Sequence, residues 1–398
     1  MKSYCKHVDI TDKNFIKPFV RYCILRHYKR YDFRKFLAEN DVNEKCYNEQ
    51  LLQNHNYKCL NHPIKMICNK ISGMIKNEDL SKLTPVKIKE TYDKTCFKTR
   101  EIGCECPLQQ CLDFIAAGAA KELFNARIVP QQCASIKGRG QIYGIKMIQK
   151  WIQKDNKAIK FASKHNFKYS PICKYFVKLD IQKCYPSMKL EQFMKFFKKD
   201  CKNEKLCWLW ESLLKTHRID DKHRGFMIGA LISQWAAQYL ISFGYRYVMS
   251  LHKNNYKKQT KVSHMIIFMD DMLLTGSNRK ELLYVVHKLQ KYMLDNFGLK
   301  IKDNYQIKEL TNQDPIDMMG FKIHRSGKIS IRSRNFIKLR RILTKFYRNN
   351  NISYSQSKRL QSYKGFYKYS NHRTLDYKYK IINVFNVAGK VIGNSFKH

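Results

Sequence analysis

Acidic residues are scarce in this chain of 398 residues, which has 32 Asp and Glu against 76 Lys and Arg. The formal net charge is therefore +44. Such an excess of positive charge repels itself unless a polyanion screens it, and this favours a nucleic-acid partner. An anionic membrane surface is the weaker alternative.

Long apolar runs are also missing. No segment approaches the roughly 20 consecutive apolar residues that span a bilayer, so we expect no membrane partner. The first four residues are not followed by an apolar stretch, which argues against a signal peptide. We therefore expect a cytoplasmic protein.

The 14 cysteines form no paired CxxC motif. In a chain without an export signal they are expected to be reduced thiols of the core rather than a disulfide framework. Structural zinc is a minor alternative because the spacing of the candidate ligands is not typical of zinc sites. Those candidates are Cys104, Cys106 and Cys111, and Cys59 with His62 and Cys68.

No internal repeat and no linker rich in Pro, Gly or Ser divides the chain. Up to residue 180 we expect helices before 90, an extended segment at 99–102, a helix at 107–124, a basic glycine loop at 135–140, a helix at 142–152 and a strand at 175–180. Beyond it we expect helices at 189–214 and 225–247, a hairpin at 265–274, a helix at 279–297, a hairpin at 319–331 and basic helices after 332. This order predicts an α+β fold with helices on one face of an antiparallel sheet.

Three aspartates accompany apolar strand segments. Asp180 ends the segment 175–180, and Asp270 and Asp271 lie inside the apolar hairpin 265–274. An unpaired buried charge costs several kcal/mol, so apolar strands seldom carry carboxylates without a reason. Taken singly, Asp180 could cap a helix and the Asp pair could form an ordinary turn. Together, on strands expected to be neighbours, they favour a metal site.

Carboxylate oxygens are the ligands of hard cations such as Mg²⁺, which keeps open positions for substrate phosphates. Two such ions a few Å apart are the usual apparatus of nucleotidyl transfer. We therefore expect Asp180, Asp270 and Asp271 to be catalytic and to hold two Mg²⁺ ions, with Mn²⁺ as a substitute.

Other residues fit such a site individually. Tyr185, five residues after Asp180, could pack on the sugar of a nucleotide and exclude a 2′-hydroxyl, although a lone tyrosine is more often a core residue. Gly229 allows close backbone approach, and Gln234 could hydrogen-bond a base edge or sugar. The plain alternative is an ordinary helix start with Ser233 near its N-cap.

Basic residues occur where a triphosphate would need them. Arg100 and the loop 135–140 offer cations, and Arg makes bidentate phosphate contacts. Such loops are also commonly just solvated. The stretch 332–369 interleaves Arg and Lys with Tyr and Phe, which suits phosphates together with sugars or bases. A helical bundle with a solvated basic face is compatible with the same pattern.

In this order the segments resemble those of a reverse transcriptase, from about Arg100 to the C-terminus. The palm carries the most specific likeness, in residues 176–187, 228–234 and 268–271, which resemble the first-aspartate strand, the following helix and the metal-binding hairpin. Looser likenesses are residues 99–102 and 135–140 to the fingers, 318–323 to the primer grip, and 361–366 to the thumb of compact bacterial enzymes.

Some positions depart from the family pattern. Ser233 and Gln234 are similar to bacterial diversity-generating and antiphage-defence enzymes rather than to the Ser-Pro of group II intron enzymes. Phe268 and Met269 replace the commoner Tyr-Ala or Tyr-Val but leave the ligands in place. Tyr305 stands where a lysine is expected, and Lys300 or Lys302 could substitute. No ribonuclease H, integrase or endonuclease motif is present.

The resemblance implies a right-hand polymerase with an N-terminal helical extension at 1–90, fingers at 91–174, a palm at 175–331 and a thumb at 332–398. Asp180 and Asp270 would bind the metals, with Asp271 in support and the Ile181 carbonyl as an extra ligand. Residues implied to contact the dNTP are Lys98, Arg100, Lys137, Arg139, Tyr185, Gln234 and Lys302. Residues implied to contact template or primer are Gly229, Ser233, Met319, Gly320 and Phe321.

The implied activity is RNA-directed DNA synthesis, with an RNA template, a DNA product and dNTPs as partners. A dedicated non-coding RNA in antiphage defence would supply the template. Copying of a template repeat by a diversity-generating retroelement is the alternative within this class. Further candidate partners are an accessory protein and a second copy of the chain. The alternative of another class is a nucleic-acid-binding scaffold without catalysis.

Overall fold

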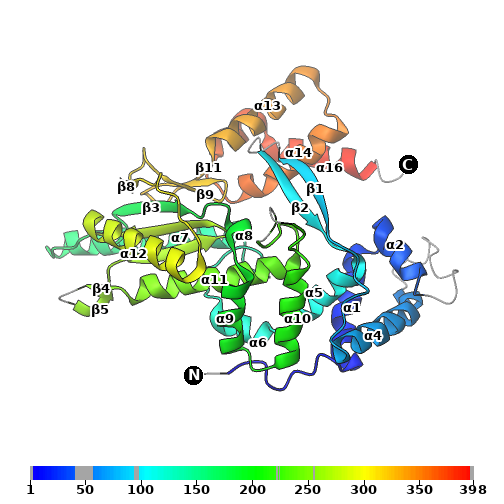
Figure 1. Cartoon of the computed structure of the whole chain (residues 1–398). Coiled ribbons are helices and arrows are strands. Elements are labelled where there is room, and N and C mark those ends of the chain that lie inside the picture. Colours follow the sequence, from blue (N-terminus) through cyan, green and yellow to red (C-terminus); the bar gives the residue numbers. More distant parts are fainter. Residues whose placement is uncertain are drawn as a thin grey trace. The chain divides into compact units, whose positions relative to one another are not determined.

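The computed structural model describes residues 3–40, 57–93, 98–220, 223, 225–253 and 256–394. It forms two compact units that combine helices and antiparallel strands (Figure 1), which confirms the predicted α+β class. The first unit contains Met1–Val129, Ile181–Tyr247 and Leu289–Ile301, and the second contains Pro130–Asp180, Val248–Lys288 and Lys302–His398. The four predicted segments are interleaved between these units, and that division stays a prediction.

The first unit is mainly helical. Its helices are α1 Lys13–His27, α2 Tyr31–Ala38, the 3₁₀ helix η2 Tyr57–Leu60, α4 Asn61–Lys76, α5 Pro107–Ala119, α6 Lys121–Arg127, α8 Cys184–Ser187, α9 Leu190–Asp200, α10 Glu204–Lys215 and most of α11 Leu231–Ser250. Helix α12 Arg279–Phe297 is divided between the two units.

Two predicted helices of this unit are each broken in two. The helix expected at 107–124 is interrupted at Ala120, whose ψ of 6° ends α5. The helix expected at 189–214 is interrupted because Tyr4 pairs with the extended Cys201. The side chain of Asn203 then accepts a hydrogen bond from the Leu206 amide at 2.9 Å and starts α10.

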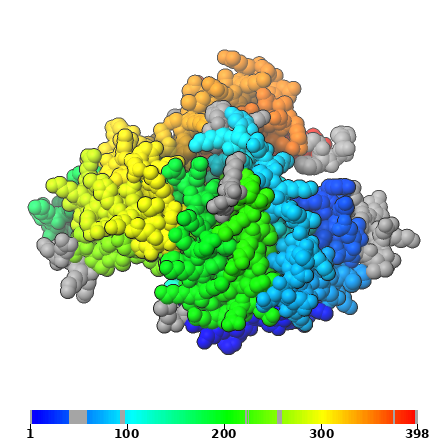
Figure 2. Space-filling model, in the orientation of Figure 1, coloured from blue at the N-terminus to red at the C-terminus, as the bar shows by residue number. Residues whose placement is uncertain are grey.

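Aromatic side chains fill the core of the first unit. Trp210 on α10 is fully buried, and its ring centroid lies 5.2–5.5 Å from those of Phe124, Phe193 and Phe197. Its indole N–H donates to the Ala116 carbonyl at 3.1 Å, so the one polar atom of the ring is satisfied. Helices α9 and α10 pack side by side, as the green surface of Figure 2 shows.

A two-stranded ribbon belongs to the same unit. Strand β1 Lys87–Asp93 pairs antiparallel with β2 Lys98–Cys104 over their whole length. Most of its described side chains are exposed on both faces, which is why no alternation of apolar and polar residues marks it in the sequence. The predicted extended segment 99–102 lies within β2.

The second unit contains the predicted antiparallel sheet, in the order β6-β7-β3-β8. Its strands are β3 Tyr175–Asp180, β6 His264–Phe268, β7 Asp271–Gly276 and β8 Ile307–Glu309. The short strands β4 His252–Lys253 and β5 Tyr256–Thr260 form a separate pair. The predicted adjacency of the two aspartate-bearing strands is confirmed, because β3 pairs directly with β7.

Helix α7 Gln141–Lys164 covers one face of this sheet and is thirteen residues longer than the predicted helix at 142–152. Its apolar side chains recur at helical spacing, in Ile145, Ile148 and Ile152, and they pack with Ile266 and Leu273 of the sheet. Apolar residues of a small second sheet complete this core.

That second sheet has three strands where a hairpin was predicted. It consists of β9 Ile316–Met318, β10 Phe321–Ile323 and β11 Ile329–Ile331, in the order β11-β10-β9. Met319 and Gly320 form the turn between β9 and β10 with φ angles of 54° and 84°. A glycine supplies the second of these left-handed conformations at no steric cost.

The C-terminal part of the second unit is helical, as predicted. It comprises α13 Ser333–Asn349, α14 Tyr354–Lys368, α15 Arg373–Tyr379 and α16 Ile381–Asn394. Leu339, Ile342 and Leu343 form the buried stripe of α13 and pack in a common core with residues of α14, α15 and α16. Ser353 and Gln356 close a capping box at the start of α14.

The twelve cysteines among the described residues are free, and nine of them are buried. None of the helices found in those parts of the chain is both long enough and apolar enough to cross a bilayer.

Candidate active site

The hairpin β6–β7 sets the position of two aspartates. Phe268 pairs with Asp271, so Met269 and Asp270 form a two-residue turn. The strands on either side are buried and apolar, and this fixes their register. Met269 adopts a left-handed backbone with φ of 56°, as tight hairpin turns require. Asp270 therefore projects from the tip of the hairpin and Asp271 begins β7.

Asp180 lies directly opposite Asp271 in the ladder between β3 and β7. Residues paired in this way have Cβ atoms about 4.5–5.5 Å apart on one face of the sheet. Burial raises the pKa of the Asp271 carboxyl, and the charges of Asp270 and Asp180 raise it further. The three predicted aspartates are thus brought together, close enough for their charges to interact.

Three cations accompany these carboxylates. Lys302 Nζ lies 2.7 Å from Asp180 Oδ1 and its amide donates to the Asp180 carbonyl at 3.0 Å. Lys178 and Arg332 both act on Asp271, lowering the pKa of its carboxyl against the effect of burial. Lys302 was predicted from the sequence, whereas Lys178 and Arg332 were missed.

A signal for Lys178 was present in the sequence. Side chains two residues apart on a strand share one face, so Lys178 had to accompany Asp180. Arg332 carried no comparable signal. It reaches the site because its amide donates to the Gly320 carbonyl at 3.0 Å and its Nε donates to Asp317 at 2.5 Å.

The donor set suits a hard cation. Oδ1 of Asp180 is buried, and the ammonium of Lys302 lies 2.7 Å from it. Among the described residues, no group of three or more His, Cys, Asp or Glu side chains is arranged to hold a metal ion by itself. Mg²⁺ commonly uses one or two carboxylates and completes its shell with water and substrate phosphates.

The basic glycine loop lies beside the hairpin tip. Residues 131–133 pair with the end of β6 through the Cys133 amide and the Ile267 carbonyl at 2.9 Å. Ser135 Oγ is then 3.9 Å from Met269 Sδ in the turn. A tight turn brings Lys137 to the exposed end of the loop and is closed by the Arg139 amide. Gly138, with φ of 77°, makes that turn possible.

The predicted template and primer residues of the second unit are mostly covered. Met319 is 5% exposed and Phe321 is 0% exposed, and both pack in the core between α7 and the sheets. A side chain at Gly320 would collide with Phe366. The side chains of Met319 and Phe321 are thus buried in this core, and the predicted role of these residues at the template and primer stays a prediction.

Besides Ile181, six predicted site residues belong to the first unit. Lys98 and Arg100 are exposed on β2, while Tyr185 on α8 and Gln234 on α11 are partly exposed. The Tyr185 carbonyl accepts a hydrogen bond from the Phe226 amide at 3.0 Å. The remaining two are Gly229 and Ser233. The roles that join these residues to the aspartates of the second unit stay predictions.

The backbone conformation and close packing at position 229 require a glycine. Its φ is 110°, and a Cβ there would lie 2.8 Å from the Ile102 side chain and 2.9 Å from the Gly103 carbonyl oxygen. The Gly103 amide in turn donates to the Ile228 carbonyl at 2.9 Å. The glycine thus serves close packing against β2 and remains exposed on its other side.

Ser233 is fully buried, and its predicted role at the template stays a prediction. Its hydroxyl lies 3.4 Å from Nδ1 of His217, whose Nε2 is 3.0 Å from Glu105 Oε1. Close by, the Ile232 amide donates to Asp113 at 3.1 Å, and burial raises the pKa of that carboxyl well above its ordinary value. This buried network, which the sequence reading missed, fixes the start of α11 and with it Gln234.

Ile181 follows Asp180 directly and is 1% exposed. It forms a backbone bridge with Ile301, and the next amide, that of Gln182, donates to the Lys300 carbonyl at 2.8 Å. Its predicted use as a carbonyl ligand stays a prediction.

The class of molecule defined by these features is an α+β chain with a carboxylate hairpin on an antiparallel sheet. No protein-family model and no curated protein matches the sequence. Among solved structures, the chain is similar to telomerase from Candida albicans in complex with a TWJ fragment of telomeric RNA. The two are 13% identical over 79% of this chain and 61% of the other, with a TM-score of 0.39.

Two structures of apo telomerase from Candida Tropicalis are similar to a comparable degree. The one truncated from its C-terminal domain is 10% identical over 73% of this chain and 69% of the other, with a TM-score of 0.40. The other is 11% identical over 71% and 59%, also with a TM-score of 0.40. The chain thus spans about three fifths of the length of the first of these structures.

Proposed function

We propose that the protein is an RNA-directed DNA polymerase. The observation that carries the proposal is the ladder pair of Asp180 and Asp271, with Asp270 at the hairpin tip beside them. Carboxylates that repel one another in an apolar sheet are costly to keep together unless a cation joins them. The same three aspartates lie in segments whose sequence resembles the palm of a reverse transcriptase.

The aspartates would hold two Mg²⁺ ions, or Mn²⁺ in their place, through Asp180 and Asp270. Asp271 would support them and the Ile181 carbonyl would be an extra ligand. When bound, the ions would supply charge to deprotonate the primer 3′-hydroxyl and to stabilise the departing pyrophosphate. Catalysis would otherwise consist of positioning and electrostatics.

The cations around the carboxylates would bind the triphosphate. Lys302 Nζ, 2.7 Å from Asp180, is within reach of any phosphate that binds beside that carboxylate. Lys137 and Arg139 occupy the loop anchored next to the hairpin tip. From the first unit, Lys98 and Arg100 would add charge, Gln234 would contact base or sugar, and Tyr185 would exclude ribonucleotides.

The C-terminal helices would hold the nucleic acid. Helix α13 has an apolar stripe on one side and basic residues on the other. A hollow of about 490 Å³ is lined by Arg340, Arg341, Thr344, Lys345, Arg348 and Asn349. Such a concentration of guanidinium and ammonium groups suits the phosphates of an RNA template paired with its DNA product. Met319 and Phe321, whose side chains are buried in the core, would support the template and primer site.

The biological setting favoured by the resemblance is antiphage defence, with a dedicated non-coding RNA as template. Synthesis from a template repeat in a diversity-generating retroelement is the alternative, because the Ser233-Gln234 pair occurs in both types. Neighbouring genes distinguish them: a variable-protein gene with a repeat pair indicates diversification.

Primer extension tests the activity. Purified protein is supplied with an RNA template, a DNA primer, dNTPs and Mg²⁺, beside an Asp270→Ala variant. Extension by the wild type alone supports the polymerase and the role of the aspartate together. If nothing is extended, incorporation of labelled dNTP without added template shows that the enzyme carries its own RNA or primes on protein. No incorporation even with co-purifying RNA and neighbouring gene products contradicts the polymerase and favours the non-catalytic scaffold.

A further inference from the structure

A second feature of the second unit lies apart from the carboxylates. Phe161 and Phe167 are 60% and 65% exposed, unusually high values for phenylalanine. Their ring centroids are 6.5 Å apart with nearly parallel planes, and His165 lies 4.4 Å from Phe161. The three rings come from the last turn of α7 and the turn that follows it.

Local backbone geometry explains why these rings meet. The Phe167 amide donates to the Ala162 carbonyl at 2.8 Å, and the intervening Asn166 is left-handed with φ of 54°. This is the Schellman ending of a helix, which is commonly accompanied by an apolar contact across the cap. Two smaller apolar side chains could make the same contact across the cap. The helix cap therefore explains why the side chains at these positions meet, but not why they are two large rings left mostly in solvent.

The segment that carries the rings is strongly basic. From Gln141 to Lys174 the sequence has eight lysines and a single acidic residue, Asp155. That aspartate is fully buried and lies 2.7 Å from Arg325, so it does not neutralise the surface.

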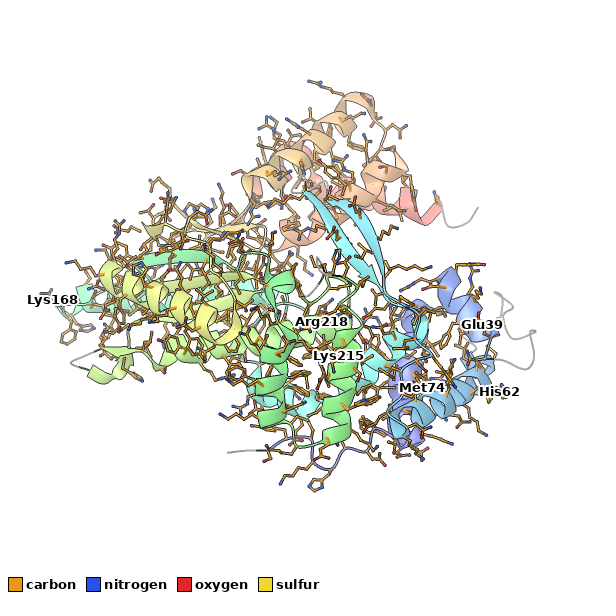
Figure 3. The ribbon with its side chains drawn as sticks, viewed as in Figure 1. Glu39, His62, Met74, Lys168, Lys215 and Arg218 are labelled. Atoms are coloured by element: carbon orange, nitrogen blue, oxygen red, sulfur yellow. The ribbon has the colours of Figure 1, made fainter. Side chains whose placement is uncertain are left out.

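Three of the lysines stand next to the rings. Lys157 lies four residues before Phe161 on the helix, and Lys164 lies three residues after it. Both lysines therefore share a face of the helix with Phe161. Lys168 follows Phe167, and all three lysines are exposed. Figure 3 shows Lys168 at the outer edge of its unit, with its side chain directed into solvent.

We propose that this surface binds single-stranded nucleic acid, with unpaired bases stacking on the rings and phosphates paired with the lysines. Stacking of bases on aromatic rings beside a basic groove is how sequence-independent single-strand binding is achieved. Bases in a duplex are already stacked on their neighbours and would have to be unstacked first, so the rings favour unpaired bases. We call the surface the aromatic platform, and it consists of Lys157, Phe161, Lys164, His165, Phe167 and Lys168.

The platform is separate from the catalytic carboxylates. It precedes Tyr175, the first residue of β3, whereas Asp180 is the last residue of the same strand. Six residues of strand extend roughly 20 Å. The platform would therefore hold a strand outside the active centre, and its binding does not depend on polymerase activity.

A photocrosslinking experiment tests the platform directly. The full-length protein is irradiated with a short single-stranded RNA carrying 5-iodouracil, at raised salt so that general phosphate contacts are weakened. Crosslinked peptides are identified by mass spectrometry. We expect crosslinks at Phe161, His165 or Phe167. The absence of crosslinks from residues 157–168 overturns the proposal.

Paired variants separate stacking from the structural role of the rings. Phe161→Leu with Phe167→Leu keeps an apolar contact across the helix cap but removes the rings, whereas the corresponding Tyr variants keep both. We expect the Leu variant to lose the crosslinks and to bind about 10-fold more weakly, since one stacked base contributes on the order of a tenfold effect or more. The Tyr variant should retain both signals, and equal behaviour of the two variants contradicts stacking.

Competition and a catalytic variant complete the test. Unlabelled single strands, RNA or DNA, should displace the labelled RNA from the platform, while duplex RNA of the same length should not. Equal competition by the duplex indicates backbone binding and overturns the proposal, as does displacement only by an added protein partner. Because Asp270→Ala leaves the platform intact, its crosslinks should persist in that variant, whether or not the wild type proves to be a polymerase.

Discussion

Asp270 and Asp271 are adjacent in sequence but differ in their environment. Asp271 starts β7, and burial raises the pKa of its carboxyl, so it ionises less readily than an ordinary aspartate. Asp270 lies in the turn, outside the ladder. Under the proposed function, Asp270→Ala should abolish primer extension and Asp271→Ala should reduce kcat by about 10–100-fold, as loss of a supporting group does. Equal or reversed losses would contradict the assigned roles.

The raised pKa of Asp271 also predicts a pH dependence. Under the proposed function the ionised carboxylate supports catalysis, so activity should fall as the pH drops through the raised pKa. Lys178 lowers that pKa, and Lys178→Gln should therefore move the acidic limb of the pH–rate profile to higher pH. Lys174→Gln, at the other end of β3, is the matched control and should leave the limb in place. An unchanged limb in Lys178→Gln would show that Asp271 does not limit the rate.

Tyr185 is the residue on which sugar discrimination would depend. It is only partly buried, and so its ring has an accessible side. Tyr185→Ala should reduce the preference for dNTPs over rNTPs by about 10–200-fold, the range for one group in a binding pocket. Tyr185→Phe keeps the ring and should keep the preference. Competition kinetics with matched dNTP and rNTP pairs measure it, and unchanged selectivity in Tyr185→Ala would remove the assignment.

At the scale of elements, one buried carboxylate adds to the apolar packing that holds α7 to its unit. Asp155 is fully buried and accepts hydrogen bonds from the Tyr169 hydroxyl at 2.9 Å, the Ile172 and Cys173 amides at 2.9 and 3.1 Å, and Arg325 at 2.7 Å. The group connects α7, the chain entering β3, and the turn between β10 and β11. A carboxylate so fully paired is tolerated in the core, but each of its partners depends on it.

Removing that carboxylate should be costly. Asp155→Ala leaves a cation and two amides without their acceptor, and we expect a loss of roughly 3–5 kcal/mol in the free energy of unfolding. Tyr169→Phe removes only one hydrogen bond and should cost about 1 kcal/mol. Urea denaturation of the two variants measures the difference. Similar small losses would show that the network is not important to stability.

The sequence predicted the parts of the site that lie on regular elements. Alternating or continuous apolar segments place Asp180 and Asp271 on strands, and pairing of those strands followed from their order. The burial of Ser233 and Phe321 could not be predicted, because it depends on residues more than ten positions away, such as His217 and those of α7. Asp155 was unpredictable for the same reason, since an acidic residue in a basic helix has the pattern of a solvated one.

Helix ends were predicted less well than helices. The break at Cys201 arises from pairing with Tyr4, a contact that no local pattern reveals. No local pattern marks the break at Ala120 either. The capping side chain of Asn203 is the one local signal that could have located the start of α10.

At the scale of the whole molecule, the net charge of +44 is the dominant property. Basic residues are spread over several described elements, including the exposed β1–β2 ribbon, the surface of α7 and the outer side of α13. Charge distributed in this way attracts nucleic acid at long range, and the range shrinks with ionic strength. Affinity for any polyanion is therefore not by itself a sign of function.

Salt dependence separates this general attraction from the proposed sites. The logarithm of the binding constant for a primer–template should fall linearly with the logarithm of salt concentration, with a slope of about −0.7 to −0.9 per phosphate contact. Neutralising Arg340 and Arg341 to Gln should make that slope shallower by about two contacts. The Leu variant of the aromatic platform should weaken single-strand binding and leave the slope unchanged, because stacking releases no counterions. A flat salt response in the wild type would contradict a surface that binds the nucleic-acid backbone.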